Sequence, residues 1–241
     1  DAMARQDPAL AQLLASSDAK PATWADLAAT IGPIEWHWPL WLPRGFLTLL
    51  VGDLGSGKSA LALRIAASFC AGWEWPDGSP STNTSKVLWC EAEAAQAINL
   101  ERAKAWSLPL GAFLTPFADP MTDICLDNKE HRAAIAAAAQ RDDVQLVIVD
   151  SLRGATRGDE NSSDAIDGVL FLATLARDTG TSVLLLHHLR KRSLQDSDTV
   201  TLDRVRGSSA IVQPARVVWA IDAPDPSRPE VRRLSVIKSN L

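Results

Sequence analysis

A glycine-rich octet with a lysine and a serine occupies residues 52–59, in the order GDLGSGKS. It fits the pattern G-x-x-x-x-G-K-[ST] of a phosphate-binding loop (P-loop), whose glycines let backbone N–H groups turn toward a phosphate chain at the amino end of a helix. In this pattern Lys58 neutralises phosphate charge and Ser59 ligates Mg²⁺. An apolar run precedes the octet and an apolar helical pattern follows it, as the loop requires. The residues expected to bind ATP with Mg²⁺ are Gly52, Asp53, Leu54, Gly55, Ser56, Gly57, Lys58, Ser59 and Ala60.

A single aspartate closes the apolar run VQLVIVD at residues 144–150. Asp150, at the end of a buried strand, can hold Mg²⁺ through its water shell. An apolar run ending in Asp is common, and by itself it equally describes a strand that ends in a turn residue. Because this run follows a P-loop, we predict that Asp150 is the Walker B carboxylate and, with Ser59, binds the metal.

Two glutamates are candidates for the group that activates water. ATP hydrolysis needs a residue that orients the attacking water or accepts its proton. Ser151, not a glutamate, follows Asp150, so the base is not expected beside it. Glu91 and Glu93 lie near the carboxyl end of the apolar run KVLWCE. A glutamate after the strand next to the P-loop strand is the RecA-type arrangement, and from the residues alone both glutamates stay candidates.

Short apolar runs alternate with helical patterns along the chain. The runs cover residues 46–52, 86–91, 121–127, 144–150, 181–188 and 215–221, and they are typical of strands buried on both faces of a parallel sheet. The helical patterns cover residues 57–71, 128–141 and 164–180. A last apolar segment, VRRLSVIKS, follows the Pro- and Asp-rich residues 222–230 and predicts an antiparallel hairpin with 215–221. We therefore expect an α/β fold with a doubly wound, mainly parallel sheet, helices on both faces and a C-terminal antiparallel edge hairpin.

The first residues of the chain differ from the rest. Residues 1–32 are rich in alanine, and PALAQLLASSD and TWADLAATIG each predict a short helix. We expect an N-terminal helical arm or linker over residues 1–32 and an ATPase core over residues 33–241. The core begins with EWHWPLW, whose three tryptophans could stack on a base, seal a subunit contact or pack inside the core. Packing is favoured, because large aromatic side chains mainly supply buried area.

Composition limits the class of protein. The 241 residues are 46% hydrophobic, which suits one sizeable core, and the formal net charge of −5 excludes an overall basic surface for nucleic acid. Cys70, Cys90 and Cys125 are widely spaced and predict reduced thiols. The longest apolar runs have the length of strands, far short of a membrane span. These features predict a cytoplasmic chain with no membrane partner.

Several motifs together resemble the RecA-type core of plasmid RepA-like hexameric replicative helicases, a group related to DnaB-type helicases. The resemblance covers residues 34–240 and rests on the P-loop followed by VLWCEAEAAQAINLER, VDSLRGATRGDENSSDAI, VLLLHHLRK, RGSSAI and VIKSN. The family pattern has a Glu followed nine positions later by an Arg, which fits Glu93 and Arg102. Relatives often have Asp-Pro after this Glu, where this chain has Ala94 and Ala95. The resemblance implies a RecA-like fold that hydrolyses ATP.

The resemblance also implies roles within the nucleotide site. It favours Glu93 over Glu91 as the catalytic base and places His188 where the family reads the γ-phosphate. A neutral imidazole at the end of a central strand can hydrogen-bond a terminal phosphate. His187 points to the opposite face of the strand, where we expect it to be packed.

Two further residues match motifs that such helicases direct at the nucleotide of a neighbouring subunit. Arg206 lies in RGSSAI and Lys238 in VIKSN. The planar guanidinium of arginine suits phosphate oxygens, and head-to-tail contacts in a ring would bring it to the next subunit. DnaB-type relatives often have an arginine two places after this lysine, where this chain has Asn240. The role of arginine finger therefore falls to Arg206.

Basic residues gather in two polar segments, 153–163 and 189–205, that follow predicted strands. Open α/β sheets place ligands at such strand ends, and six copies around a channel would concentrate positive potential. Acidic residues dilute this charge and neither segment has an aromatic residue, so a solvated mixed-charge loop is the alternative. We expect binding to single-stranded DNA through phosphates, without sequence preference. The candidates are Arg153, Arg157, Arg190, Lys191, Arg192 and Arg204.

The expected activity is ATP hydrolysis by a ring-forming motor. The resemblance implies a replicative DNA helicase domain that translocates on single-stranded DNA, assembles with itself as a hexameric ring and meets other replication proteins. The alternative is a RecA-type ATPase of a recombination or regulatory oligomer without helicase activity. The residues expected to act in catalysis are Glu93, Lys58, His188, Arg206 and Lys238.

Overall fold

The computed structural model describes residues 21–81, 84–158, 163–193, 199–207, 209–225, 227–228 and 230–241. The chain divides into two units between Ile34 and Glu35. In the first unit, helix α2 (Trp24–Thr30) begins at a capping box formed by Thr23 and Asp26, which agrees with the helix predicted in TWADLAATIG. The helix predicted in PALAQLLASSD lies outside the described residues.

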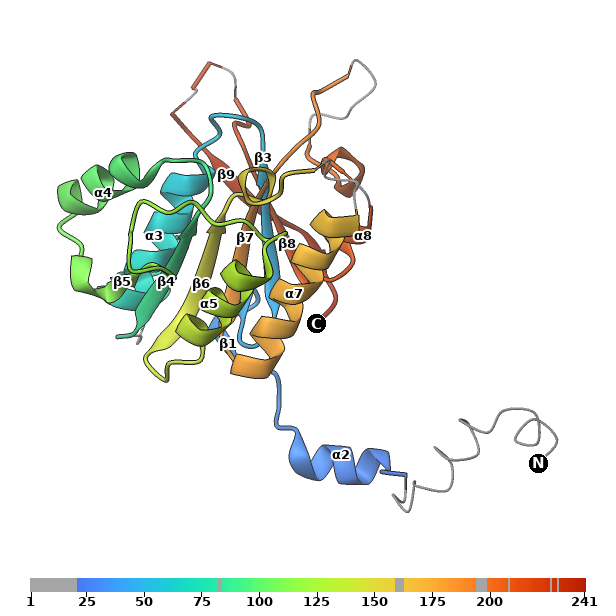
Figure 1. The fold of residues 1–241 in the computed structure, drawn as a ribbon. Coiled ribbons are helices and arrows are strands. Elements are labelled where there is room, and N and C mark those ends of the chain that lie inside the picture. The colour runs from blue at the N-terminus through green and yellow to red at the C-terminus, as the bar shows by residue number, and fades with distance from the viewer. Residues whose placement is uncertain are drawn as a thin grey trace. The chain divides into compact units, whose positions relative to one another are not determined.

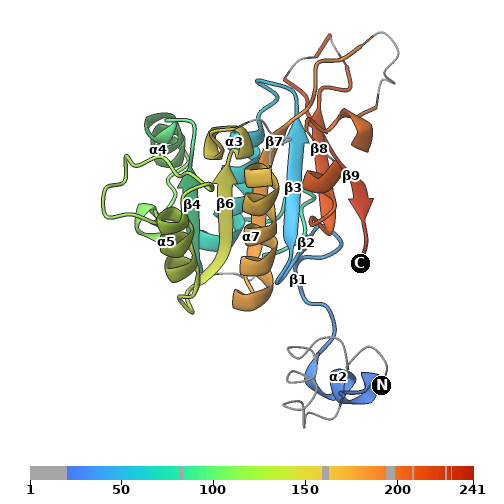
Figure 2. The same ribbon diagram turned by 45° about the vertical axis from the view of Figure 1, so that its right-hand side comes forward.

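The second unit is built around a seven-stranded sheet whose strand order is β5-β4-β6-β7-β3-β8-β9 (Figures 1 and 2). All neighbouring strands are parallel except β8 and β9, which form the predicted antiparallel hairpin at the edge. The predicted fold class is thereby confirmed. The strands are β3 (Leu47–Gly52), β4 (Lys86–Glu91), β5 (Phe113–Leu114), β6 (Val144–Asp150), β7 (Ser182–His188), β8 (Val217–Asp222) and β9 (Arg233–Ser239).

Helices cover both faces of the sheet (Figure 2). Helices α3 (Lys58–Cys70) and α4 (Gln96–Ala105) pack on one face, and α5 (Lys129–Ala139), α7 (Ser163–Thr179) and the short α8 (Ser209–Val212) on the other. Alternate strand residues supply the two cores: Leu184 and Leu186 of β7 face α3, while Val183 and Leu185 face α7. Both faces are buried, so the strands read as continuous apolar runs instead of alternating ones.

The expected strand at residues 121–127 is wrong. These residues form no strand, and the edge position beside β4 belongs to the two-residue β5. The segment passes over the ends of the sheet instead, where the Ile124 N–H donates to the Glu91 carbonyl and the Leu126 N–H to the Ala155 carbonyl, both at 2.7 Å. Because this crossing segment buries Ile124 and Leu126, it carries the same apolar signature as a strand.

Trp36 and Trp38 lie in β1 (Trp36–Trp38) of a small two-stranded antiparallel sheet, and Trp41 lies in the turn that leads to its partner β2 (Leu42–Pro43). Trp38 is buried and stacks between Trp41 and Trp75, with ring centroids 4.7 and 5.4 Å away, and meets Trp219 edge-on. Trp38 and Trp41 thus have the packing role that the sequence favoured, against the helix-α3 side of the core.

The three cysteines are free thiols, and burial raises the pKa of Cys70 to about 11. This agrees with the absence of a disulfide framework in the sequence. Within the described part of the chain, no helix combines the length and the apolar character needed to cross a bilayer.

Candidate functional site

The P-loop connects the end of β3 to the start of α3. Gly57 precedes the helix with a φ of 94°, in the left-handed region that glycine adopts most easily. Gly52 needs its missing side chain for another reason: a Cβ there would lie 2.5 Å from the Ser56 hydroxyl and 2.9 Å from the Ile221 carbonyl. The loop therefore folds as the motif predicts, with its amides at the amino end of α3.

A pocket of about 230 Å³ opens beside this loop. Besides P-loop residues, its walls contain three of the other predicted site residues: Glu93, Asp150 and His188. They meet because β4, β6 and β7 are parallel to β3, so the carboxyl ends of all four strands lie at one edge of the sheet. The P-loop residues in its walls are Leu54, Gly55, Gly57, Lys58, Ser59 and Ala60.

Lys58 lies folded back onto the loop. Its Nζ donates to the carbonyls of Gly52 at 3.0 Å and Asp53 at 2.9 Å. Burial lowers the pKa of Lys58, and the charge of Asp150 opposes this effect. The ammonium group therefore stays beside the pocket and within the loop that would hold phosphates.

Asp150 and Ser59 have the chemistry of a Mg²⁺ site. Asp150 is buried, and this burial raises the pKa of its carboxyl to about 6 even though the Ser59 hydroxyl donates a hydrogen bond to it. The second carboxylate oxygen, Oδ2, is buried and has no partner among the described residues. An orphaned carboxylate oxygen beside a hydroxyl fits the oxygen ligands that Mg²⁺ prefers.

Glu93 faces the pocket. Its Oε1 lies 3.4 Å from Nε2 of His188 and also accepts a hydrogen bond from the Ser151 hydroxyl. The hydrogen bond from His188 is the largest cause that lowers the pKa of Glu93 to about 2. Glu93 is therefore an ionised acceptor at the phosphate site.

Glu91 lies elsewhere. Its buried carboxylate lines a different, mainly apolar pocket between β4 and α4, so only one of the two candidate glutamates reaches the P-loop. The expected position of this strand beside the P-loop strand is wrong, because β6 and β7 separate β4 from β3. The two glutamates follow a strand that is the neighbour of the Walker B strand instead.

His187 and His188 point to opposite faces of β7, as expected. His187 is fully buried, and its Nε2 donates to the Arg206 carbonyl at 2.7 Å, which fixes the tautomer. Burial lowers the pKa of His187 to about 4. His187 is a packed, neutral residue that ties residue 206 to the end of β7.

The two residues expected to act on a neighbouring subunit do not line the pocket of their own chain. Arg206 is exposed, and its N–H donates to the His188 carbonyl at 3.1 Å. Lys238 donates through Nζ to the carbonyls of Val212 at 2.8 Å and Ala215 at 2.7 Å, at the end of α8. Arg206 is thus bound to the end of β7 but lies outside the pocket. Lys238 binds carbonyl groups at the end of α8.

Arg204 corrects a prediction. We expected it to face DNA or solvent, but it is only 4% exposed. Its guanidinium pairs with Asp53 of the P-loop at 3.2 Å. The short helix η2 (Leu202–Arg204) turns this side chain inward, so it belongs to the nucleotide site's surroundings.

The other candidate DNA residues lie on the surface near the same edge of the sheet. Arg153 and Arg157 are exposed in and after α6 (Leu152–Ala155), and Lys191 and Arg192 are exposed after β7. Arg190 is partly buried and pairs with Asp203 at 3.3 Å. Glu160 and Asn161, which belong to the segment VDSLRGATRGDENSSDAI of the resemblance, lie outside the described residues.

Arg102 also lines the pocket, although its sequence position alone did not predict a site role. It projects from α4 into the walls of the P-loop pocket, where its charge would meet phosphate. The spacing of nine residues after Glu93 was the available signal, because it places Arg102 two turns into the helix that follows the glutamate.

Comparison with known proteins agrees with this geometry. Residues 15–193 match the family model of an AAA domain (AAA_25). The chain belongs to this AAA domain family. The match supports the RecA-type P-loop ATPase part of the predicted resemblance. Among solved structures, the chain is similar to that of the RadB recombinase, with 21% identity over 83% of each chain and a TM-score of 0.55. At this identity the likeness shows that the AAA domain has a RecA-like fold.

The buried histidine of this AAA domain predicts a pH dependence. The pKa of His187 is lower in the folded chain than its ordinary value of 6.5, so folding favours the neutral form. Stability that is present above pH 6.5 is therefore lost as the pH falls toward 4, by roughly 3 kcal/mol from this group. His187→Gln keeps a donor for the Arg206 carbonyl but does not titrate. The free energy of unfolding in urea, measured from pH 7.5 to 4, should fall less steeply for the variant, and parallel curves would contradict the assignment.

Proposed function

We propose that this chain is a Mg²⁺-dependent ATP hydrolase that works as a homo-oligomeric motor on single-stranded DNA, as a replicative helicase does. One observation carries the hydrolase part: Glu93, Asp150 and His188 come from three separate strand ends and meet the P-loop in one pocket. A phosphate-binding site without turnover needs only the loop. A carboxylate, a metal-site aspartate and a histidine at the same pocket supply what hydrolysis needs in addition.

Each of these groups has a distinct task in the proposed reaction. The P-loop amides and Lys58 bind the phosphate chain, and Ser59 with Asp150 holds the metal. Bound Mg²⁺ supplies positive charge to the phosphate oxygens. Glu93, kept ionised by its hydrogen bonds, accepts a hydrogen bond from the attacking water. His188 contacts both Glu93 and the space for the terminal phosphate, so it can register the loss of that phosphate.

The role proposed for Arg206 requires assembly with further copies of the chain. Arg206 is held by its main chain at the end of β7 and lies outside its own pocket. A head-to-tail ring would present it to the ATP of the next subunit. The RGSSAI motif supports the same role. Lys238 is proposed to contribute charge at that interface, beside the carbonyls that it caps.

Two functions on DNA are consistent with this site. The order of motifs favours a helicase, in which Arg153, Arg157, Arg190, Lys191 and Arg192 track phosphates. The alternative is a recombination or regulatory ATPase that does not unwind DNA, and the likeness in fold to the RadB recombinase is the observation that favours it.

Substitution of the proposed base tests the hydrolase. Glu93→Gln removes the acceptor but preserves the shape of the side chain, so turnover of ATP should fall by about 100-fold or more while nucleotide binding persists. Steady-state hydrolysis and equilibrium binding of a fluorescent ATP analogue measure the two effects. Glu101→Gln, on the exposed face of α4, is the matched control and should keep full turnover. Retained turnover in Glu93→Gln would overturn the role of Glu93, since Glu91 does not line the P-loop pocket.

Subunit mixing tests the action in trans. Arg206→Ala and Lys58→Ala subunits should each be inactive alone, because each lacks one half of every interface site. Mixed rings contain some interfaces with both residues, so hydrolysis should partly return. Co-assembly is confirmed by particle mass with and without an ATP analogue. A monomer in both states, or co-assembled mixtures without activity, would overturn the role of Arg206.

A strand-displacement assay with ATP separates the two functions on DNA. Arg153→Ala and Lys191→Ala should weaken the stimulation of hydrolysis by single-stranded DNA, most clearly at low salt, because each removes a phosphate contact and so makes DNA affinity less dependent on salt. Arg141→Ala, on an exposed residue paired with Asp143 at the opposite end of β6, is the control. Hydrolysis that ignores single-stranded DNA would exclude the helicase, and stimulation without strand displacement would favour the recombination alternative.

A further inference from the structure

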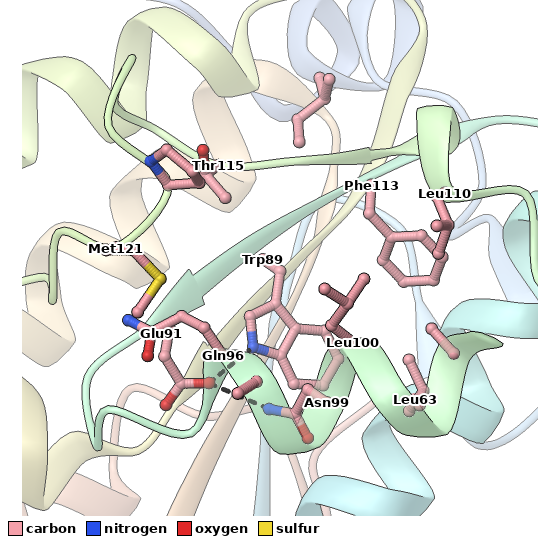
Figure 3. A pocket seen from close by; sticks show the side chains of 14 residues that line it. Leu63, Trp89, Glu91, Gln96, Asn99, Leu100, Leu110, Phe113, Thr115 and Met121 are labelled. Carbon is pink, nitrogen blue, oxygen red and sulfur yellow. Dashed lines mark hydrogen bonds between the residues drawn. The ribbon is translucent and has the colours of Figure 1, made fainter. Parts of the chain in front are cut away.

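Glu91, the glutamate that does not reach the P-loop, is surrounded by hydrogen-bond donors. Its Oε1 accepts from the backbone N–H groups of Ala92 at 3.2 Å and Glu93 at 3.0 Å. Its Oε2 accepts from Asn99 Nδ2 at 3.0 Å and Trp89 Nε1 at 3.3 Å. Figure 3 shows the carboxylate between the indole and the amide. A carboxylate, which only accepts, is the side chain that can satisfy all four donors.

One oxygen of Glu91 holds the proposed base. The N–H of Glu93 is bound to it directly, so the backbone of the catalytic residue is fixed at the point where the chain leaves β4. Ala94 follows with a φ of 54°, and α4 starts at Gln96. This sharp turn leaves the Glu93 side chain facing the P-loop pocket while Glu91 faces the other way.

The other oxygen of Glu91 is connected through Asn99 to Arg102, which also lines the nucleotide pocket. Asn99 donates to Glu91 through Nδ2, and its Oδ1 accepts from Arg102 Nη1 at 3.3 Å. Arg102 lines the P-loop pocket together with Glu93. Glu91 and Asn99 therefore connect a base and a cation that lie on two different elements, the loop after β4 and helix α4.

Glu91 and Asn99 are buried, which strengthens the hydrogen bonds between them. Glu91 and Asn99 are 4% and 8% exposed. They lie at the side of a pocket of about 380 Å³ whose other walls include Leu63, Leu100 and Phe113 (Figure 3). Hydrogen bonds in such an apolar setting are stronger than in water, and a donor left without its acceptor there is costly.

We propose that Glu91, with Asn99, is a positioning residue for ATP hydrolysis, holding Glu93 by its N–H group and Arg102 by its guanidinium in the geometry that turnover needs. This inference rests on the proposed function. It explains why the turn after β4 has two glutamates: one carboxylate serves the reaction and the other holds the first in place.

Two isosteric substitutions test the proposal. In Glu91→Gln, an NH₂ group replaces one carboxylate oxygen and faces N–H donors that need an acceptor. In Asn99→Asp, the introduced carboxylate faces the carboxylate of Glu91. Each should lower kcat by about 10- to 100-fold, since small misplacements of catalytic groups have effects of this size. Nucleotide affinity should fall less than kcat, because the P-loop is untouched and only the contact of Arg102 with phosphate is loosened. Steady-state kinetics and binding of the ATP analogue measure both quantities.

The combined variant, Glu91→Gln with Asn99→Asp, is the decisive measurement. The introduced amide can then donate to the introduced carboxylate, whose second oxygen still accepts from Arg102, and the amide oxygen still accepts from the Glu93 N–H. The indole of Trp89 loses its acceptor in Glu91→Gln and in the double variant alike, so recovery is expected to be partial. The double variant should therefore recover at least about fivefold in kcat over the poorer single variant. A residue that merely stabilises the fold would show no such recovery, and additive losses in kcat would overturn the proposal.

A control and a second variant make the outcome unambiguous. Ser182→Ala removes a buried hydrogen bond to the Pro43 carbonyl at the far end of β7, and should reduce the urea midpoint without changing kcat. If Glu91→Gln does not fold, Asn99→Ala decides: a loss in kcat larger than the loss in affinity supports the proposal, and unchanged kcat overturns it. If the unaltered protein does not hydrolyse ATP, or if Glu93→Gln hydrolyses it equally fast, the proposed function itself fails. If Glu93→Gln is inactive but Glu91→Gln has full kcat, only the positioning role fails.

Discussion

Parallel pairing of four strands is the constraint on which the rest of the structure depends. In register, Gly52 of β3 lies opposite His188 of β7, and Glu91 of β4 lies opposite Asp150 of β6. The strands therefore end together, and each leads into a residue or loop of the site. A shift of one residue in any pair would turn the corresponding side chain to the other face of the sheet. The two buried cores hold this register, because each strand supplies residues to both.

The two carboxylates at the P-loop have different environments, and these suit different tasks. Asp150 is buried with one oxygen unpartnered, and burial raises its pKa to about 6, so a bound cation would relieve an unfavourable charge. Glu93 is partly exposed and hydrogen-bonded by His188 and Ser151, which lower its pKa to about 2. The environment proposed for the metal and the one proposed for the attacking water are separated in this way within a single pocket.

The segment after β7 is connected to the nucleotide site at several points. Arg204 pairs with Asp53 of the P-loop, and the main chain of Arg206 is bound to both histidines of β7. The same segment begins with the exposed basic residues Lys191 and Arg192. The P-loop, the end of β7 and residues 204–206 are therefore joined by an ion pair and by main-chain hydrogen bonds.

Local patterns in the chain were sufficient for part of this structure. The P-loop, the Walker B strand and most strands and helices follow from spacing and apolar periodicity, which depend on neighbouring residues only. Periodicity also made residues 121–127 look like a strand, since a buried crossing segment has the same apolar run. The positions of the two histidines were predictable because adjacent side chains on a strand point to opposite faces.

The sequence by itself determined which chemistry is present: a phosphate-binding loop, a strand-end aspartate, two glutamates and a histidine. Only the tertiary structure decided which glutamate lines the P-loop pocket and that Arg204 is buried against Asp53. It alone also decided that β4 neighbours β6 and that Trp38 packs inside the core. The physical reason is that strand order, burial and the partner of a charged group depend on contacts between residues far apart in the chain. Residue type and spacing specify what a side chain can do, and packing specifies what it can reach.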